Sequence, residues 1–289
     1  MELVIQQLSA GLSVGSILLL VALGLAIIYG TMGVINLAHG EFLMLGAYST
    51  WFLEKQLGVG LLPSVVLAFF MVAAMGWIIE RTVVQHLYHR PLDTILATWG
   101  IGMMLEQAVR LTAGGELRYV KLPSSMDSSV QLLGTTVSVY RLLIIAIALA
   151  LVALTWFLMT RTEYGMKVRA VTQNRAIAEC YGINARRVYS LTFAYGAGLA
   201  GVAGALVAPI KSVSPDMGTH FVVDAFLVVV IGGVGSLLGT FVSAGILGEL
   251  NATLAYVLND TLAKAIVFLA VIVLIRFRPQ GLFSARTRG

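Results

Sequence analysis

The sequence has little charge and almost no cysteine. Of 289 residues, 19 are Lys or Arg and 14 are Asp or Glu, so charged residues make up 11% of the chain. Ordinary soluble domains carry about 25%, because their large outer surface needs polar groups. The shortage argues against a soluble enzyme, a nucleic-acid-binding protein and a disordered chain. The single cysteine, Cys180, excludes a disulfide scaffold.

Long hydrophobic runs take the place of the missing charges. Hydrophobic residues make up 58% of the chain, and the mean hydropathy is +0.91. A helix needs about 20 apolar residues to cross about 30 Å of hydrocarbon. Apolar segments with isolated charges cover 93–113 and 261–275, and the charge-free runs are 3–40, 56–79, 142–160, 188–210 and 225–248. We therefore predict an all-α polytopic membrane protein, with about eight to nine transmembrane helices in a single domain over residues 1–289.

Basic residues gather in three regions. They are the connection between Arg81 and Arg90, the segment 161–187, and the C-terminal end with Arg276, Arg278, Arg286 and Arg288. The positive-inside rule predicts that all three are cytoplasmic. We therefore expect an external N-terminus, a cytoplasmic C-terminus and an external loop over 114–140. These ends require an odd number of crossings, so nine fits, whereas eight requires a re-entrant segment.

The net charge of +5 follows from this topology. Basic cytoplasmic loops lie against anionic inner-leaflet lipid. We therefore expect contact with membrane lipid and no nucleic-acid partner.

The segment 161–187 contains a predicted helix of its own. Residues 174–181 include helix formers, and Gly182 stands where a glycine ends a helix. Such a short helix between two spans fits a groove on a soluble partner. The alternative, an amphipathic helix lying on the inner leaflet, stays open on these grounds alone.

Polar side chains interrupt the apolar runs. Asn36 and His39 lie beside Glu41, and the acids within apolar sequence are Glu41, Glu106, Asp224 and Glu249. Acids at membrane depth normally face a bundle interior or a wet cavity. The stretch around Gly40 is typical of a broken helix that lines a cavity, and 232–236 marks a second break. Glycine-interrupted segments in both halves indicate an inverted repeat, although the two halves show no clear residue similarity.

Several motifs carry a family resemblance. Residues 170–183 (AVTQNRAIAECYGI) resemble the coupling loop of bacterial ABC importer permeases. Residues 33–48 (GVINLAHGEFLMLGAY) and 224–240 (DAFLVVVIGGVGSLLGT) resemble signatures of the branched-chain amino-acid type permeases. Within that family, LATWGI, TQNRA and RPQGLF, which begin at residues 96, 172 and 278, are more similar to the urea-transporter permease. The resemblance covers residues 8–283, and only the loop beginning at Arg118 (RYVKLPSS) matches no subfamily pattern.

The resemblance implies an ABC importer permease fold and a transport role. The implied substrate is urea, moved across the bacterial inner membrane and driven by ATP hydrolysis on partner subunits. The alternative is a branched-chain amino-acid or short-amide importer. The implied partners are a homologous second permease subunit, two ATP-binding-cassette ATPases and a periplasmic substrate-binding protein.

The resemblance also assigns residues to the ATPase contact. They lie on and around the coupling helix: Thr172, Asn174, Arg175, Ala176, Glu179 and Gly182. Arg175 and Glu179 are four residues apart on one helix face. They are the candidate polar contacts with the ATPase, and the alternative is that they only solvate the helix.

A small polar solute needs donors and acceptors along its path. We expect the substrate pathway to include Asn36, His39, Glu41, Thr98, Asp224 and Ser236. The alternative is that some of these residues only tie helices together.

No catalytic site is expected in this chain. The phosphate-binding motif G-x-x-x-x-G-K-[ST] is missing, so ATP must be hydrolysed by a partner. The match to G-x-S-x-G at residues 11–15 opens an apolar helix, not the strand–turn–helix that this nucleophile motif needs. His39 has no second ligand at metal spacing, and no cofactor is expected. An intramembrane enzyme or an ion channel is a further alternative, but a channel has no need of the helix at 172–182.

Overall fold

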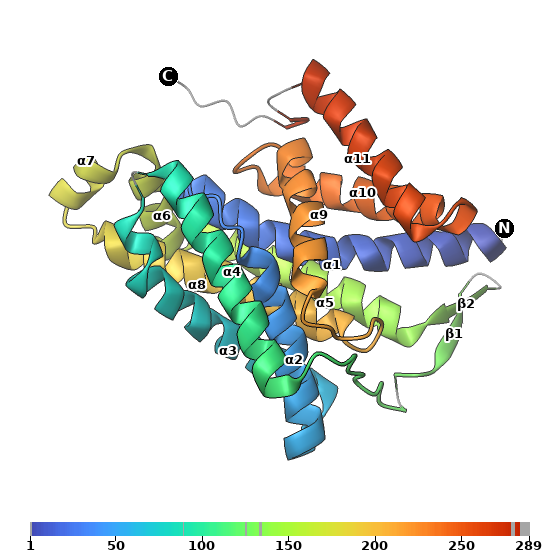
Figure 1. Cartoon of the computed structure of the whole chain (residues 1–289). Coiled ribbons are helices and arrows are strands. Elements are labelled where there is room, and N and C mark those ends of the chain that lie inside the picture. The colour runs from blue at the N-terminus through green and yellow to red at the C-terminus, as the bar shows by residue number, and fades with distance from the viewer. Residues whose placement is uncertain (1, 89, 125, 133–134, 279–280, 284–289) are drawn as a thin grey trace.

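The computed structural model describes residues 2–88, 90–124, 126–132, 135–278 and 281–283, and it is mostly helical (Figure 1). The predicted all-α fold is therefore confirmed. Arg286 and Arg288, two of the predicted cytoplasmic basic residues, lie outside the described part. The long helices within it are α1 (Glu2–Met32), α2 (His39–Leu57), α3 (Leu61–Thr82), α4 (Pro91–Ala113), α5 (Val139–Arg161), α8 (Ala185–Val207), α9 (Met217–Gly232), α10 (Leu237–Val257) and α11 (Asp260–Phe277).

Some of these helices meet the length and hydropathy of a membrane span on their own. Within the described residues there are five: Gln6–Met32, Leu61–His86, Val139–Arg161, Ala185–Val207 and Leu237–Val257. Helix α9 is apolar but has only 16 residues. The other long helices carry more polar residues, so the number of crossings stays a prediction.

Helices α1 and α8 form the centre of the bundle. In each, 83% of the most apolar stretch is buried, against 17% in α5, which lies at the periphery. Small residues on α8 allow the close approach of its neighbours. A Cβ at Gly204 would overlap the Leu43 carbonyl oxygen of α2, and one at Gly201 would lie 2.8 Å from the Val72 side chain of α3.

The two halves of the chain pack as inverted equivalents. Helix α10 packs along α1 and α3 packs along α8, while α4 contacts α2 and α11 contacts α9. At the centre, a Cβ at Gly196 would lie 2.7 Å from the Gly24 carbonyl oxygen, and a Cβ at Gly24 would overlap the Gly196 carbonyl. Gly40 and Gly218 meet in the same reciprocal way. This pairing of α1–α4 with α8–α11 supports the predicted inverted repeat and leaves α5 outside it.

Helices α1 and α8 run in opposite directions, which makes the repeat inverted. Tyr140 Oη at the start of α5 donates a hydrogen bond to the Leu206 carbonyl oxygen at the end of α8 (2.7 Å). The hairpin before α5, β1 (Ser129–Leu132) with β2 (Thr135–Ser138), contacts α1 and lies beside the N-terminus in Figure 1. The start of α1 and the end of α8 therefore share one end of the bundle.

The three regions predicted to be cytoplasmic share the other end. The Arg175 guanidinium, in the segment 161–187, lies 6.0 Å from the ring of Tyr88, between α3 and α4. Near the C-terminus, the Leu282 N–H donates to the Ile231 carbonyl oxygen at the end of α9 (2.7 Å). Gly235, after α9, lies beside Gly30 near the end of α1. The three basic regions therefore lie at the same end of the bundle, as the positive-inside rule requires. Which end faces the cytoplasm stays a prediction.

The two predicted breaks differ in kind in the structure. Helix α1 ends at Met32 and α2 begins at His39, so the break around Asn36 lies where the sequence predicts it. Residues 233–236 instead form a tight turn between α9 and α10, with Gly233 at φ +89 and Gly235 at φ +78. In the inverted packing, the equivalent of the first break is the interval 208–216 between α8 and α9. The predicted break at 232–236 is therefore confirmed as an interruption between two helices, but it is not the structural counterpart of the first break.

The predicted external loop docks onto that interval. Arg118 and Val213 exchange two backbone hydrogen bonds of 2.9 and 2.8 Å. The Arg118 guanidinium lies 5.0 Å from the ring centre of Trp51 on α2. These contacts explain why a basic residue occurs on a side that is otherwise poor in basic residues.

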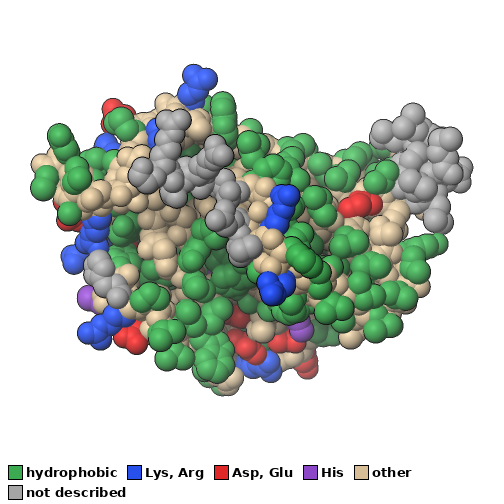
Figure 2. Space-filling view, turned by 90° about the horizontal axis from the view of Figure 1, so that it is seen from above, with side chains coloured by type: hydrophobic (Ala, Val, Ile, Leu, Met, Phe, Trp, Pro, Cys, Tyr) green, Lys and Arg blue, Asp and Glu red, His purple; other side chains and the backbone are tan. Residues whose placement is uncertain are grey.

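Hydrophobic side chains are spread across the face seen in Figure 2, whereas charged side chains form only small groups on it. On α4, the exposed fractions of Leu92, Leu96, Trp99 and Met103 lie between 52% and 76%. An exposed apolar helix face of this kind is what a lipid environment requires.

Candidate functional site

The break between α1 and α2 brings together four of the predicted pathway residues, Asn36, His39, Glu41 and Thr98. The Thr98 Oγ1 of α4 accepts a hydrogen bond from the Leu37 N–H (3.1 Å), and Asn36 Oδ1 accepts one from the Ala38 N–H (3.1 Å). Both side chains are fully buried. They satisfy backbone groups that the break removes from helical hydrogen bonding.

His39 and Glu41 link the start of α2 to two other helices. His39 Nε2 lies 3.0 Å from the Val21 carbonyl oxygen in the middle of α1, so α2 begins deep within the bundle. Glu41 Oε1 accepts a hydrogen bond of 3.5 Å from Thr219 Oγ1 in the first turn of α9. The N-termini of α2 and α9 meet here, and the helices diverge from this point in Figure 1. The Glu41 carboxylate therefore lies between two positive helix ends.

This group, the break cluster, is closed and only partly satisfied. Asn36 and His39 are fully buried and Glu41 is 5% exposed. Asn36 Nδ2, His39 Nδ1 and Glu41 Oε2 have no hydrogen-bond partner among the described residues. No group of three or more His, Cys, Asp or Glu suited to a metal ion occurs there either. Unpartnered polar atoms suit a polar solute or water, and in this structure they are buried away from the surface.

Asp224 lies apart from the break cluster. It occurs on α9 in a pocket of about 700 Å³, and its Oδ2 pairs with Lys264 Nζ of α11 at 3.2 Å. The pocket is also lined by the first half of α1 and the second half of α10, which includes Asn251. This Asp224 pocket therefore occupies the half of the bundle near the N-terminus, which is the predicted external side.

Ser236 is also separate from the other predicted pathway residues. It caps α10, because its Oγ accepts a hydrogen bond from the Gly239 N–H at 3.0 Å. The turn lies at the opposite end of the bundle from the Asp224 pocket. The six predicted pathway residues thus occupy three places, and Ser236 has a structural role as an N-cap.

The predicted coupling segment forms α6 (Glu163–Gln173), which packs against the bundle, and α7 (Arg175–Cys180), which protrudes at one end in Figure 1. Asn174 caps α7, since its Oδ1 accepts a hydrogen bond from the Ile177 N–H at 3.0 Å. Gly182 follows α7 at φ +80, a left-handed conformation that favours glycine. The predicted short helix ended by glycine is confirmed. Its Ile177 and Tyr181 side chains are 56% and 83% exposed, as a helix that enters a partner's groove would require.

The remaining predicted coupling residues have simple local roles. Thr172, on α6, donates a hydrogen bond from Oγ1 to the Val168 carbonyl oxygen (2.9 Å), and Ala176 lies in the first turn of α7. Arg175 Nε donates to Glu179 Oε1 at 3.1 Å, so the two predicted ATPase contacts are bonded to each other. Their contact with an ATPase stays a prediction.

Arg175 also joins α7 to the body of the protein. Its guanidinium lies 6.0 Å from the ring centre of Tyr88 and 5.6 Å from that of Tyr189 on α8. The Tyr88 hydroxyl donates to the carboxylate of Glu80, a fully buried residue at the end of α3. Burial raises the pKa of Tyr88 well above its usual value, so the hydroxyl stays protonated as a donor. These contacts link α7 to α3 through Tyr88 and Glu80, and to α8 through Tyr189.

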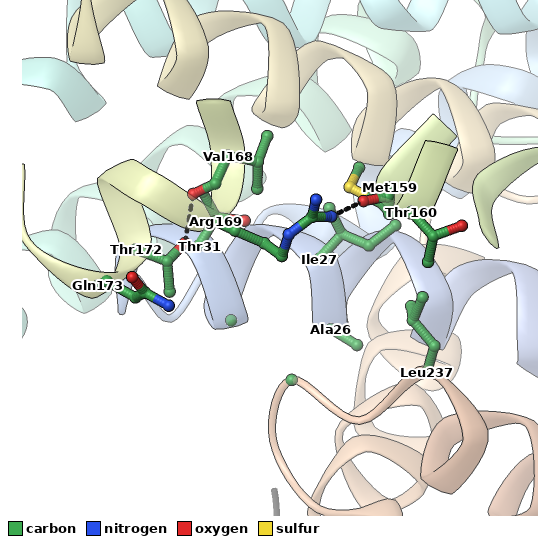
Figure 3. Close-up of a pocket in the computed structure, with 12 residues that line it drawn as sticks. Ala26, Ile27, Thr31, Met159, Thr160, Val168, Arg169, Thr172, Gln173 and Leu237 are labelled. Carbon is green, nitrogen blue, oxygen red and sulfur yellow. Dashed lines mark hydrogen bonds between the residues drawn. The ribbon is translucent and has the colours of Figure 1, made fainter. Parts of the chain in front are cut away.

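Helix α6 is attached to its neighbours at several points. Arg169 reaches the Met159 carbonyl oxygen at the end of α5, across a pocket of about 380 Å³ that Thr31 and Leu237 also line (Figure 3). Tyr164 Oη shares a hydrogen bond of 2.7 Å with Thr192 of α8. Burial raises the pKa of Tyr164 to about 12, so this contact persists at any physiological pH.

Several residues of these sites could not be identified from the sequence. Lys264 appears there only as an isolated charge in an apolar segment, which was a usable signal for a partner acid. Tyr88, Tyr189 and Glu80 give no such signal. Their role depends on contacts between α3, α7 and α8 that no local pattern encodes.

Comparison with known proteins identifies branched-chain amino acid permeases as relatives, and the matches with them cover almost the whole chain. A family described as "Branched-chain amino acid transport system / permease component" matches residues 7–276. The chain is 32% identical to the branched-chain amino acid permease protein BraD of Pseudomonas aeruginosa, and 30% identical to LivH of Escherichia coli. Each alignment covers 97% of this chain and 95% of the relative. LivM of Escherichia coli is 27% identical over 92% of this chain and 67% of its own length. No solved structure matches.

These relatives bear on the choice between a urea permease and a branched-chain amino acid permease. They are transport permeases and not enzymes, as expected. None of the three relatives described is named for urea, so the closer resemblance to a urea permease is not supported, and the branched-chain alternative is better supported. The chain is a multi-pass membrane permease that belongs to the permease component family of branched-chain amino acid transport systems.

Proposed function

We propose that this protein is the permease subunit of an ABC importer that moves branched-chain amino acids across the bacterial inner membrane. The observation that carries the proposal is the identity of 30–32% with LivH and BraD, over 95% of their length. Both are named for high-affinity branched-chain amino acid transport. Urea is not the substrate in this proposal.

The transport system needs further subunits. Two ATPases supply the energy, a periplasmic binding protein delivers the amino acid, and a homologous second permease completes the membrane part. The similarity to LivM as well as to LivH supports a pairing of two related permeases. The exposed helix α7 supports an ATPase below, with Arg175 and Gly182 holding that helix in place.

The route of the solute follows from the two polar regions. In this proposal the N-terminus and the Asp224 pocket face the periplasm, and α6 and α7 face the cytoplasm. The break cluster is the closed constriction between them. Since the N-termini of α2 and α9 meet at Gly40 and Gly218, a rotation of one half against the other opens it.

Reconstitution tests the proposal directly. The complete importer in vesicles should take up labelled leucine when ATP is present on the ATPase side, and should take up no labelled urea. Uptake of urea without leucine would contradict the substrate. Uptake by this chain alone without ATP would contradict the importer mechanism altogether. Vesicles that lack the binding protein are the control.

A further inference from the structure

The Asp224 pocket combines opposite charges with apolar walls. Asp224 and Lys264 pair at 3.2 Å, and their side chains are 19% and 38% exposed. Both belong to largely apolar helices, where a charged side chain normally faces a protein interior or a wet cavity. The pocket volume of about 700 Å³ falls within the range of about 300–1,000 Å³ that small-molecule sites occupy.

The chemistry of the pocket matches one class of solute. An α-amino acid carries an ammonium and a carboxylate on the same carbon atom. Asp224 can accept hydrogen bonds from the ammonium while Lys264 donates to the carboxylate. Asp224 and Lys264 then each exchange their present partner for the opposite pole of the solute, so neither of the two is left unpaired.

Two further features complete the match. Asn251 lines the same pocket, and its Oδ1 is buried with no hydrogen-bond partner in the described residues. This carbonyl oxygen provides a second acceptor for the ammonium. Val14, Leu18 and Phe221 form apolar wall on the side of α1 and α9, where an aliphatic side chain can pack.

We infer that the Asp224 pocket binds an α-amino acid as a zwitterion, with the ammonium on Asp224 and Asn251 and the carboxylate on Lys264. The inference rests on the proposed function and adds to it the point of first contact with the permease. The substrate class is a zwitterionic amino acid with an aliphatic side chain. A neutral solute such as urea offers no carboxylate to Lys264 and would leave the ion pair intact.

Uptake by charge-neutral variants is the first test. Asp224→Asn, Lys264→Gln and the double variant are reconstituted with the partner subunits. Each should reduce leucine uptake about tenfold or more, with unchanged assembly in the membrane. Leucine uptake by the double variant should be no higher than uptake by either single variant. The controls are Asp93→Asn and Lys167→Gln, which remove exposed charges outside the pocket. A double variant with normal uptake would mean that the pair is only structural, and would overturn the inference.

Chemical labelling provides a second measurement that leaves the pair intact. In a Cys180→Ser background, Ala255→Cys introduces the single cysteine of the chain into the wall of the pocket. Leucine should slow its labelling by a charged thiol reagent several-fold. Isopentylamine, which lacks the carboxylate, and 4-methylpentanoate, which lacks the ammonium, should not. If the importer transports leucine but leucine leaves the labelling rate unchanged, the inference fails and the proposed function stands. If no leucine is transported, the proposed function itself fails.

Discussion

The break cluster and the Asp224 pocket are both polar regions in an apolar bundle, but they differ in what their polar groups contact. In the break cluster, Asn36 and Thr98 hydrogen-bond to backbone groups and are fully buried. In the pocket, Asp224 and Lys264 contact each other and remain partly exposed. The difference teaches that a polar residue at membrane depth has two distinct uses. Asn36 Oδ1 and Thr98 Oγ1 keep an interrupted helix stable, whereas Asp224 and Lys264 are available to a solute while the constriction is still closed. Variants of the two regions should therefore fail in different ways.

The largest effect should come from the glycine contact beside the break cluster. In Gly40→Ala, the new Cβ overlaps the Gly218 carbonyl oxygen, so α2 and α9 must move apart. We expect a loss of stability of roughly 3 kcal/mol, at the upper end of the range for overpacking. The measurement is the thermal unfolding midpoint of the complex in detergent.

The control for this prediction is Gly100→Ala on α4, where an added Cβ meets no atom within 4 Å. That substitution should leave the midpoint unchanged or raise it slightly, because alanine favours the helix by about 1 kcal/mol. Equal midpoints for the two variants would contradict the importance of the close approach.

The next effect concerns the backbone at the break. Thr98→Val keeps the shape of the side chain but removes the acceptor of the Leu37 N–H. A buried donor without a partner costs about 2 kcal/mol, so stability should fall while the uptake per folded molecule stays near normal. Thr98→Val and Asp224→Asn are both measured for uptake and for the unfolding midpoint. Asp224→Asn should keep a normal midpoint and lose uptake. If Thr98→Val abolished uptake at full stability, Thr98 would belong to the pathway and the contrast between the regions would be lost.

A substitution at Arg175 should have a smaller effect on stability but a clear effect on the coupling of ATP hydrolysis to transport. Arg175→Ala removes the contacts of α7 with the rings of Tyr88 and Tyr189, worth about 1 kcal/mol. We expect ATP hydrolysis by the importer to continue while leucine uptake falls several-fold, because α7 no longer moves α3 and α8 with it. The ratio of uptake to hydrolysis is the measurement. Arg186→Ala, which removes an exposed positive charge at the start of α8, should leave this ratio unchanged.

The smallest effect should occur on the exposed face of α6. Lys167 pairs with Glu163 at 3.2 Å, and their side chains are 45% and 83% exposed. Such pairs contribute about 0.3 kcal/mol or less. Lys167→Ala should therefore leave both the midpoint and the uptake within error, which makes it the baseline for the other variants. A large change would show that α6 contacts a partner through this residue.

Much of the scaffold could be predicted from the sequence, because its signals are local. The charge-free runs define most of the long helices, and the polar residues around Asn36 mark the break. Asn174 and Gly182 define the ends of α7 through capping, which involves only neighbouring residues. The sequence does not predict the hairpin, although Ser129–Leu132 alternates polar and apolar residues, since a short alternation in a long polar loop is a weak signal.

The grouping of the site residues could not be predicted, because it depends on contacts between distant segments. Glu41 meets Thr219 across most of the chain, and Asp224 meets Lys264 on another helix. The glycines at 232–236 predict a second break, whereas the structural counterpart of the first break is the interval 208–216, where the residues bear no similarity to 33–38. Inverted packing requires equal helix geometry but not equal side chains, so the sequence does not reveal it.

The inverted packing of α1–α4 against α8–α11 has a consequence for the direction of transport. A scaffold whose halves exchange under a half-turn in the membrane plane has no top or bottom of its own. In the proposed importer, the direction of transport must therefore be encoded in what the two halves do not share. Those parts include the side chains, which differ between the halves, and the segment between them, with α5, the hairpin before it, and α6 and α7 after it. Because α6 and α7 occur at one end of the bundle only, this segment makes the two ends of a nearly symmetric scaffold different.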